Sequence, residues 1–182
     1  MNYAKVFKGA IETNFCKQVI SELQDAEYQQ HKFYNPHDDM SNTRSGAQEL
    51  DVSFSDIPSR NLLMKKMWPV VRKYVDDLDM PWFDTWQGYS NVRFNRYTEN
   101  RKMALHADHI QSLFDGERKG IPILSILGVL NDNYKGGEFV LIDKVINFKG
   151  GDILIFPSNF MYPHKVEPVI EGTRYSYISW LW

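Results

Sequence analysis

The sequence predicts a mainly β fold with flanking helices, an α+β arrangement in one domain. Two observations support this prediction. Up to about residue 80 the apolar residues recur at helical spacing, and from about residue 82 short β-type runs alternate with glycine-marked turns. Many short strands of this kind are typical of a sandwich or barrel. We therefore expect a single domain over 1–182, with helical support over about 1–80 and a β core over about 82–182.

Two helices are expected in the first part. Thr13 can cap the first helix, whose apolar face consists of Phe15, Val19, Ile20, Leu23 and Ala26. The second helix should begin near Pro58 and bury Leu62, Leu63, Met67, Val70, Val71 and Tyr74. Pro69 falls inside it and should kink or divide it. Residues 31–56 lack a sustained period and predict a long loop of the kind that forms lids or binding loops.

The β part contains five clear segments. Residues 89–97 alternate in near-regular fashion, and residues 121–130 form a nearly continuous apolar run. Two Gly-Gly pairs each open a further β segment, as turn signals do. The predicted segments are 89–97, 121–130, 138–142, 152–156 and 173–182. Helices first and strands afterwards would place the helices against one face of the β unit.

Composition narrows the classes of partner. The formal net charge of −2 indicates no nucleic-acid or anionic membrane partner. A single cysteine, Cys16, allows no intramolecular disulfide and fits a reducing compartment. The N-terminus lacks the apolar run of a signal peptide, and no stretch approaches ~18 consecutive apolar residues. These features predict a cytoplasmic protein and leave its oligomeric state open.

A candidate metal site lies in the segment 103–108, where a strand should end. Residues two apart on a strand point to the same face, so His106 and Asp108 project together. His164, which follows one β run and precedes another, can supply a third ligand from a distant strand. Two imidazoles and one carboxylate leave other coordination positions open, as in non-haem iron(II) oxygenases.

The motif H-x-D alone is also common in surface pairs and capped turns. A zinc hydrolase could use the same three ligands. The remaining histidines, His31, His37 and His109, fall in predicted loops and are expected to be solvent-exposed. The ligand pattern by itself therefore leaves the chemistry open.

Arg174 and Ser176 favour the oxygenase. Arg174 lies ten residues after His164 on the following predicted strand, and Ser176 faces the same way. The guanidinium is a planar, permanently charged fork that binds a carboxylate in bidentate fashion. A hydrolase has no use for a buried carboxylate clamp beside its metal, whereas an enzyme that uses 2-oxoglutarate must hold the far carboxylate of this co-substrate.

These residues carry a resemblance to a known family. H-A-D, G-G-E-F, F-P-S-N-F-M-Y-P-H-K-V-E-P-V and G-T-R-Y-S resemble the prolyl 4-hydroxylase-like branch of the 2-oxoglutarate/iron(II)-dependent dioxygenase superfamily over about residues 88–182. The resemblance implies a double-stranded β-helix (jelly roll) buttressed by N-terminal helices. It implies iron(II), 2-oxoglutarate and O2 as cofactor and co-substrates, with ascorbate as an accessory reductant.

The resemblance also assigns roles. His106, Asp108 and His164 match the iron ligands, and Arg174 matches the residue that binds the far carboxylate of 2-oxoglutarate. Tyr97 matches a co-substrate-binding tyrosine, and core packing explains it equally well. Beside these, Trp180 matches an aromatic residue near the iron, again with packing as the alternative. Several relatives carry a second tyrosine in the strand that corresponds to 123–130, where this chain offers only Ser125 as a polar side chain. Binding of the co-substrate is therefore expected to depend more on Tyr97, Arg174 and Ser176. The Asp108 ligand favours hydroxylation over halogenation.

The substrate implied first is a prolyl residue of a protein or peptide, with a free amino acid or other small molecule as the alternative. Residues 31–56 and 110–120 would form the mouth of the pocket. The charges there that could meet substrate, or simply be solvated, are Arg44, Arg101, Arg118 and Lys119. A non-catalytic jelly-roll binding module is the competing class, and the intact metal and arginine positions disfavour it.

Overall fold

The computed structural model describes residues 3–32, 48–80, 88–108 and 121–182. These residues confirm a mainly β protein with few helices. The predictions for Arg44, Arg118, Lys119, His37 and His109 fall on segments outside the described residues.

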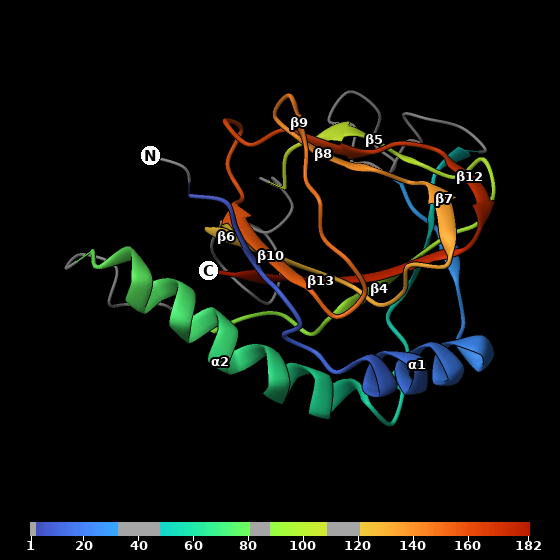
Figure 1. Cartoon of the computed structure of the whole chain (residues 1–182), viewed down its shortest axis with the longest axis horizontal. Coiled ribbons are helices and arrows are strands. Elements are labelled where there is room, and N and C mark those ends of the chain that lie inside the picture. The colour runs from blue at the N-terminus through green and yellow to red at the C-terminus, as the bar shows by residue number, and fades with distance from the viewer. Residues whose placement is uncertain (1–2, 33–47, 81–87, 109–120) are drawn as a thin grey trace.

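Antiparallel pairing builds two main sheets and a small ribbon. In spatial order, the larger sheet consists of β1 (Lys5–Phe7), β10 (Ile153–Pro157), β6 (Leu124–Val129), β13 (Arg174–Leu181), β4 (Arg93–Tyr97), β3 (Asp51–Ser53) and β2 (Gln29–Gln30). The smaller sheet consists of β5 (Met103–His106), β11 (His164–Val166), β8 (Phe139–Leu141) and β9 (Lys144–Val145), and the ribbon pairs β7 (Tyr134–Gly136) with β12 (Val169–Gly172). The two sheets face each other, and helices α1 (Thr13–Glu22) and α2 (Arg60–Leu78) lie along the outer side of the larger one (Figure 1).

Helix α1 begins one residue earlier than the predicted cap allows. Glu12 is the N-cap residue, with extended backbone angles, and Thr13 is already helical. No side chain caps this end, so the prediction that Thr13 caps the helix is wrong. The buried face is close to the predicted one, with Val19 fully buried and Leu23 buried in the short 3-10 helix Leu23–Asp25 that follows.

Helix α2 buries most of its predicted stripe. Its fully buried residues are Leu63, Met67, Val71 and Tyr74, and Val70 packs against them at half burial. Leu62 is the exception, because 48 % of its surface is exposed. It precedes Leu63 by one position, about 100° around the helix, and this rotation carries it off the buried face.

Pro69 does not divide α2, which continues from Arg60 to Leu78. A proline inside a helix removes the N–H that would bond to the carbonyl four residues earlier, here that of Lys65. Both Pro69 and Lys65 are exposed, so water can bind the freed carbonyl. The helix is therefore not divided, because the position of the missing backbone hydrogen bond faces solvent.

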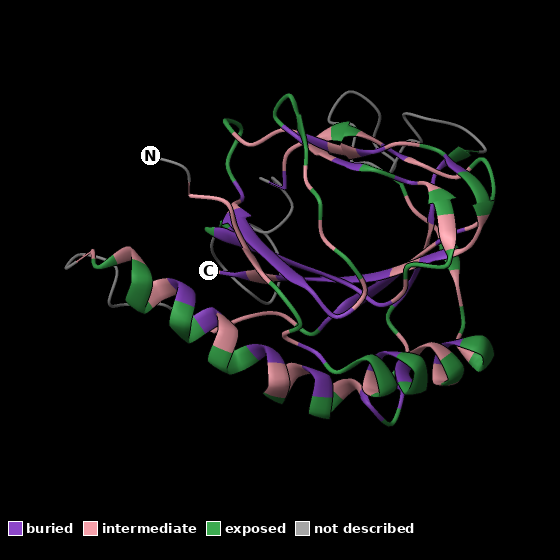
Figure 2. Ribbon diagram, viewed as in Figure 1, coloured by how far each residue is buried: buried purple, intermediate pink, exposed green. Residues whose placement is uncertain are grey.

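Two hydrophobic cores lie on opposite faces of the larger sheet. The first joins it to the helices and includes Val19, Leu63, Met67, Phe94, Ile126, Ile155 and Tyr177. The second fills the space between the sheets and includes Leu127, Phe139, Leu141, Leu154, Phe156, Val166 and Ile178. Neighbouring residues such as Ile126 and Leu127 point to opposite faces, and both are buried (Figure 2). Burial on both faces explains the nearly continuous apolar run predicted at 121–130.

The predicted loop 31–56 contains a strand. β3 pairs with β4 through Val52 and Asn95, and β2 extends the sheet by one more strand. The sequence of β3, Asp-Val-Ser, is too short and polar to show alternation, so only its tertiary pairing identifies it as a strand. The edge strand β1 was not predicted either, because it has only three residues and its partner β10 lies far along the chain.

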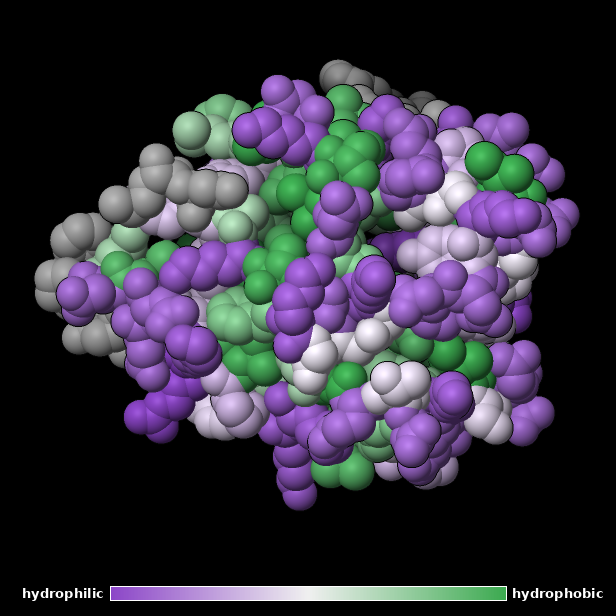
Figure 3. All heavy atoms as spheres, in the orientation of Figure 1, coloured by the Kyte–Doolittle hydropathy of each residue, from purple (hydrophilic) through white to green (hydrophobic). Residues whose placement is uncertain are grey.

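The face of the molecule shown in Figure 3 is mostly hydrophilic. In the space-filling view, hydrophilic side chains cover most of the helical side, while apolar ones gather near the middle of the visible face (Figure 3). Among the described residues, no helix combines the length and the apolar character needed to cross a membrane.

Candidate metal centre and co-substrate pocket

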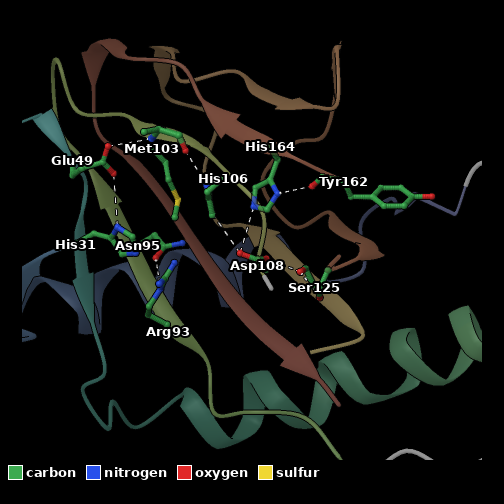
Figure 4. Close-up of polar contacts among 12 residues, drawn as sticks. His31, Glu49, Arg93, Asn95, Met103, His106, Asp108, Ser125, Tyr162 and His164 are labelled. Atoms are coloured by element: carbon green, nitrogen blue, oxygen red, sulfur yellow. Dashed lines mark hydrogen bonds and ion pairs between the residues drawn. The ribbon is translucent and has the colours of Figure 1, made fainter. Parts of the chain in front are cut away.

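The two histidines of the predicted cluster face each other on neighbouring strands. β5 ends at His106, β11 begins at His164, and the Cα atoms of these two residues are direct partners. Their ring centroids lie 4.3 Å apart. Asp108 follows β5, and its carboxylate lies beside both rings (Figure 4). The structure thus brings the three sequence-predicted ligands together.

The ligand atoms are spaced for a single ion. Asp108 Oδ1 lies 3.4 Å from His106 Nε2 and 3.6 Å from His164 Nε2. The candidate ligand atoms of all three residues lie within 4.8 Å of one another. Two ligand atoms that each lie ~2.1 Å from one ion are roughly 3 Å apart or slightly more. The observed spacing therefore fits a metal ion, and two imidazoles with one carboxylate are the donors that non-haem iron(II) prefers.

Each histidine is oriented through its second ring nitrogen. His106 Nδ1 lies 2.8 Å from the carbonyl oxygen of Ala104, and His164 Nδ1 lies 3.1 Å from that of Tyr162. A carbonyl only accepts hydrogen bonds, so Nδ1 must carry the proton and Nε2 keeps its lone pair. Such contacts fix the tautomer that a metal requires.

Two serines hold the carboxylate. Ser125 Oγ donates a 2.6 Å hydrogen bond to Asp108 Oδ2 and lies 2.8 Å from Ser158 Oγ. Both serines and Asp108 are buried. Because Oδ2 is held by Ser125, Oδ1 is left facing the two Nε2 atoms. Ser125, predicted as a co-substrate residue, thus contacts a metal ligand in this structure.

The pocket also fixes the protonation states of its ligands. Burial lowers the pKa of His164 to about 4, against the attraction of the Asp108 charge. Burial alone would raise the pKa of Asp108, but the electrostatic influence of His164, the interactions with His106 and the hydrogen bond from Ser125 outweigh it and lower that pKa well below its usual value. At neutral pH His164 is therefore neutral and Asp108 ionised, which are the states that bind metal.

Arg174 lies on the interior face of the larger sheet, meaning the face that points toward the smaller sheet. Only 1 % of its surface is exposed, and Nη1 donates a 2.9 Å hydrogen bond to Ser176 Oγ. The guanidinium carbon lies 5.0 Å from the ring centroid of Tyr97, the Cα partner of Arg174. Its buried Nε has no hydrogen-bond partner among the described residues. An orphaned donor on a buried guanidinium fits a carboxylate ligand.

The two predicted aromatic residues lie on the same face. Tyr97 is buried, its hydroxyl contacts Met103 Sδ at 3.8 Å, and burial raises its pKa to about 12. Trp180 is half-buried, is the Cα partner of Ser125, and has a buried Nε1 without a partner among the described residues. Tyr97 thus lies beside Arg174, and Trp180 pairs with Ser125, which bonds to Asp108.

His31 was expected to be exposed, and this prediction is wrong. Only 11 % of its side chain is exposed, and its Nδ1 lies 3.8 Å from Oε2 of the buried Glu49. Glu49 Oε1 in turn accepts a hydrogen bond from the backbone N–H of Ala104, on the strand that ends at His106. The prediction failed because 31–56 was expected to be a loop, whereas His31 directly follows β2 and donates its backbone N–H to Leu50 O.

Two further arginines lie near this part of the structure. Arg101, expected to face solvent or substrate, donates from Nη1 to the carbonyl of Glu49 at 2.8 Å, so it supports the backbone beside β5. Arg93 was not singled out, yet it is buried on the interior face. The sequence could have indicated this placement. Arg93 lies two residues before Asn95 and four before Tyr97, and residues at that spacing share a strand face.

Fold and site together define a class of protein. A β structure with helices on one side carries two histidines and an aspartate that converge from two strands, with a buried arginine on the facing sheet. This is the arrangement of a non-haem iron(II) oxygenase. The model of the 2OG-Fe(II) oxygenase superfamily matches residues 92–182, half of the chain, and the chain belongs to this superfamily.

Curated relatives match about half of the chain. A PKHD-type hydroxylase of Idiomarina loihiensis is 34 % identical over 96 residues, which are 50 % of this chain and 42 % of the relative. A PKHD-type hydroxylase of Stutzerimonas stutzeri is 32 % identical over 95 residues, covering 48 % and 41 % respectively. The match thus spans about two fifths of the length of these relatives.

Solved structures share the fold over nearly the whole chain. A prolyl hydroxylase from Trichoplax adhaerens, in complex with a hypoxia inducible factor peptide fragment, has a TM-score of 0.71 at 16 % identity and covers 100 % of this chain and 84 % of its own. A Pseudomonas putida prolyl-4-hydroxylase has a TM-score of 0.69 at 12 % identity, with 100 % and 92 % coverage. At these identities the likeness concerns the fold.

Proposed function

We propose that this chain is an iron(II)- and 2-oxoglutarate-dependent dioxygenase that hydroxylates an unactivated C–H bond, first of all in a prolyl residue of a protein or peptide. The observation that carries the proposal is the pairing of the His106–Asp108–His164 cluster with the buried clamp of Arg174 and Ser176. When bound, iron(II) would couple oxidative decarboxylation of 2-oxoglutarate by O2 to hydroxylation of the substrate, yielding succinate and carbon dioxide.

The roles of the residues follow from their contacts. His106, Asp108 and His164 would hold the metal on one side and leave the other side free. Ser125 keeps Asp108 ionised and oriented. At the other end, Arg174 and Ser176 would bind the far carboxylate of 2-oxoglutarate, because the buried guanidinium keeps Nε and its remaining Nη donors for a ligand.

Tyr97 and Trp180 complete the proposed pocket. Tyr97 would orient the co-substrate from beside Arg174, since its ring already contacts the guanidinium. Trp180 would border the metal on the last strand, near Ser125. Both side chains help to exclude water from the reacting atoms. Ascorbate would serve as an accessory reductant.

The architecture belongs to the same proposal. We infer that the two facing sheets are the halves of a double-stranded β-helix and that residues 1–182 form one catalytic domain, with helical support over about 1–80. The antiparallel order of the sheets supports this inference. The prolyl substrate is supported by the fold likeness to prolyl hydroxylases, and the PKHD-type relatives support a hydroxylase.

The test is an anaerobic titration of the protein with iron(II) and 2-oxoglutarate. The chelate should give a weak visible charge-transfer band that is absent from His164→Ala. A band in the wild type, lost in the variant, would support the proposed chemistry and reduce the problem to finding the substrate. Iron binding without a band would favour a binding module, and hydrolytic activity with zinc would favour a hydrolase.

A further inference from the structure

Arg93 is a buried arginine that the proposed chemistry does not use. It alternates on β4 with Asn95 and Tyr97, so all three side chains point between the sheets. Only 8 % of its surface is exposed, and no carboxylate in the described parts of the chain forms an ion pair with it. Burial of a charge without an ion-pair partner is costly. Such a residue suggests a ligand that supplies the missing charge.

Two contacts fix the head of this side chain. Nε donates a 3.1 Å hydrogen bond to Asn95 Oδ1, and the guanidinium carbon lies 5.2 Å from the ring centroid of Trp180. Within the described residues these contacts leave the N–H donors of both Nη atoms unused. The two Nη groups of an oriented guanidinium form a fork that matches the two oxygens of a carboxylate.

The Arg93 head lies toward the metal cluster. Trp180, which it contacts, is the Cα partner of Ser125, and Ser125 bonds to Asp108. Arg93, Trp180 and Ser125 lie on the same face of the adjacent strands β4, β13 and β6. The electrostatics agree, because burial lowers the pKa of Arg93 while the charge of Asp108 acts to raise it.

Arg93 is also distinct from the proposed co-substrate clamp. Arg174 is the Cα partner of Tyr97, four residues along β4 from Arg93, and four residues of strand span roughly 13 Å. The Arg174 head lies against Tyr97, whereas the Arg93 head lies against Trp180. The far carboxylate of one 2-oxoglutarate molecule would be bound at Arg174, which leaves Arg93 for a second ligand.

A second buried carboxylate, that of Glu49, does not serve Arg93. Glu49 accepts the Ala104 N–H with Oε1 and faces His31 with Oε2. Figure 4 shows the His31 ring between Glu49 and Asn95, with Arg93 on the far side of Asn95. The charge of Glu49 is therefore engaged at β5 and His31.

We propose that Arg93 binds a carboxylate group of the primary substrate, on the metal side of the pocket away from Arg174. This inference rests on the proposed function, and it names the chemical class of the substrate. The carboxylate could belong to a free amino acid or other small acid, or to an acidic side chain or C-terminus of a peptide. In either case its docking on Arg93 would fix which C–H bond faces the metal.

The test compares acids with their amides. The iron(II)- and 2-oxoglutarate-loaded protein is supplied with free L-amino acids and with proline-containing peptides that carry one acidic residue, each beside its neutral amide, and succinate release is measured. We expect at least one acid to stimulate release and its amide to have about 10- to 100-fold lower kcat/KM, the range for a charge-assisted hydrogen bond of about 1.5–3 kcal/mol. Succinate release stimulated by the free amino acids would assign the carboxylate to a small acid, and release stimulated by the peptides would assign it to a peptide.

Variants connect the preference to Arg93. Arg93→Gln, which can still bond to Asn95, should shrink the acid preference to about twofold, and Arg93→Lys should retain part of it. Arg72→Gln, an exposed site on α2, is the matched control and should retain it all. Broadening of the ligand NMR signals by manganese(II)-loaded protein without O2 gives a binding readout that needs no turnover, and Arg93→Gln should weaken the effect for the acid only.

Several results would overturn the inference. One is that the visible band forms but no compound, or only neutral compounds, stimulate succinate release. Another is that the preference for the acid survives in Arg93→Gln. A higher 2-oxoglutarate requirement in Arg93→Gln, with an unchanged acid preference, would assign Arg93 to the co-substrate. Absence of the visible band from the wild type would instead mean that the proposed function itself has failed.

Discussion

At the scale of single residues, removal of a candidate metal ligand should leave the fold intact. His106 and Asp108 belong to neither hydrophobic core, so His106→Ala and Asp108→Ala should fold while losing iron and reducing succinate release to background. Iron content, succinate release and circular dichroism are the measurements. Asp76→Ala, an exposed aspartate on α2, is the control. Undiminished turnover in either variant would contradict the ligand assignment.

Arg174 governs a different quantity, the requirement for 2-oxoglutarate. Loss of a buried, charge-assisted carboxylate contact costs about 1.5–3 kcal/mol, so Arg174→Ala should raise the half-saturating 2-oxoglutarate concentration roughly 10- to 100-fold. Ser176→Ala removes only a partner of Nη1 and should raise it less. Succinate release at varied 2-oxoglutarate measures both. An unchanged requirement in Arg174→Ala would remove the residue from this role.

At the scale of elements, the larger sheet depends on a glycine that faces the helices. Gly128 on β6 is the Cα partner of Tyr177, and a Cβ at Gly128 would lie 2.1 Å from the tyrosine ring. Tyr177 is fully buried, so its ring cannot move away. Gly128→Ala should lower the free energy of unfolding by about 1–3 kcal/mol or more.

Denaturant unfolding measures this cost, and a double-mutant cycle assigns it. Tyr177→Leu removes the ring, so Gly128→Ala should cost much less in that background. Equal costs in both backgrounds would mean that the clash with the ring is not the cause.

The elements also separate what the sequence predicts from what it does not. Helix α2, β6, β10 and β13 were predicted because their periodicity is long enough to read. β3 was not, because the burial of its Val52 comes from pairing with β4, about forty residues later in the chain. The same distinction applies to the site. His106 and Asp108 share a local spacing, whereas Ser125 and Glu49 reach the cluster only through tertiary pairing, which no local pattern encodes.

At the scale of the whole molecule, the larger sheet separates stability from chemistry. The residues that it contributes to the first core lie on its helix-facing side and are apolar. The residues of its interior face alternate with these along the same strands. The polar residues on this face are Arg93, Asn95, Tyr97, Ser125, Arg174 and Ser176. Because strand neighbours point to opposite faces, one sheet can both pack on helices and line a charged pocket. The cost of this arrangement is that charged and titratable groups are buried inside the protein.

That cost predicts a pH dependence for the metal-free protein. A histidine has a pKa of about 6.5 in the unfolded chain, whereas burial holds His164 at about 4. Between these values the unfolded state binds a proton that the native state excludes, so stability is full above about pH 6.5 and falls as the pH drops toward 4. The loss should be about 3 kcal/mol by pH 4. Burial lowers the pKa of His31 as well, which adds to the loss in the same direction.

Unfolding midpoints of metal-free protein between pH 7.5 and 4.5 measure this loss. His164→Gln cannot gain the proton, so its stability should fall less over the same range, with His31 accounting for the remaining slope. Iron(II) binds the deprotonated ligands and stabilises the native state, so it should raise the midpoint more at pH 7.5 than at pH 5. An identical slope in His164→Gln would mean that another group carries the acid sensitivity, and a metal effect independent of pH would contradict ligation by a histidine of lowered pKa.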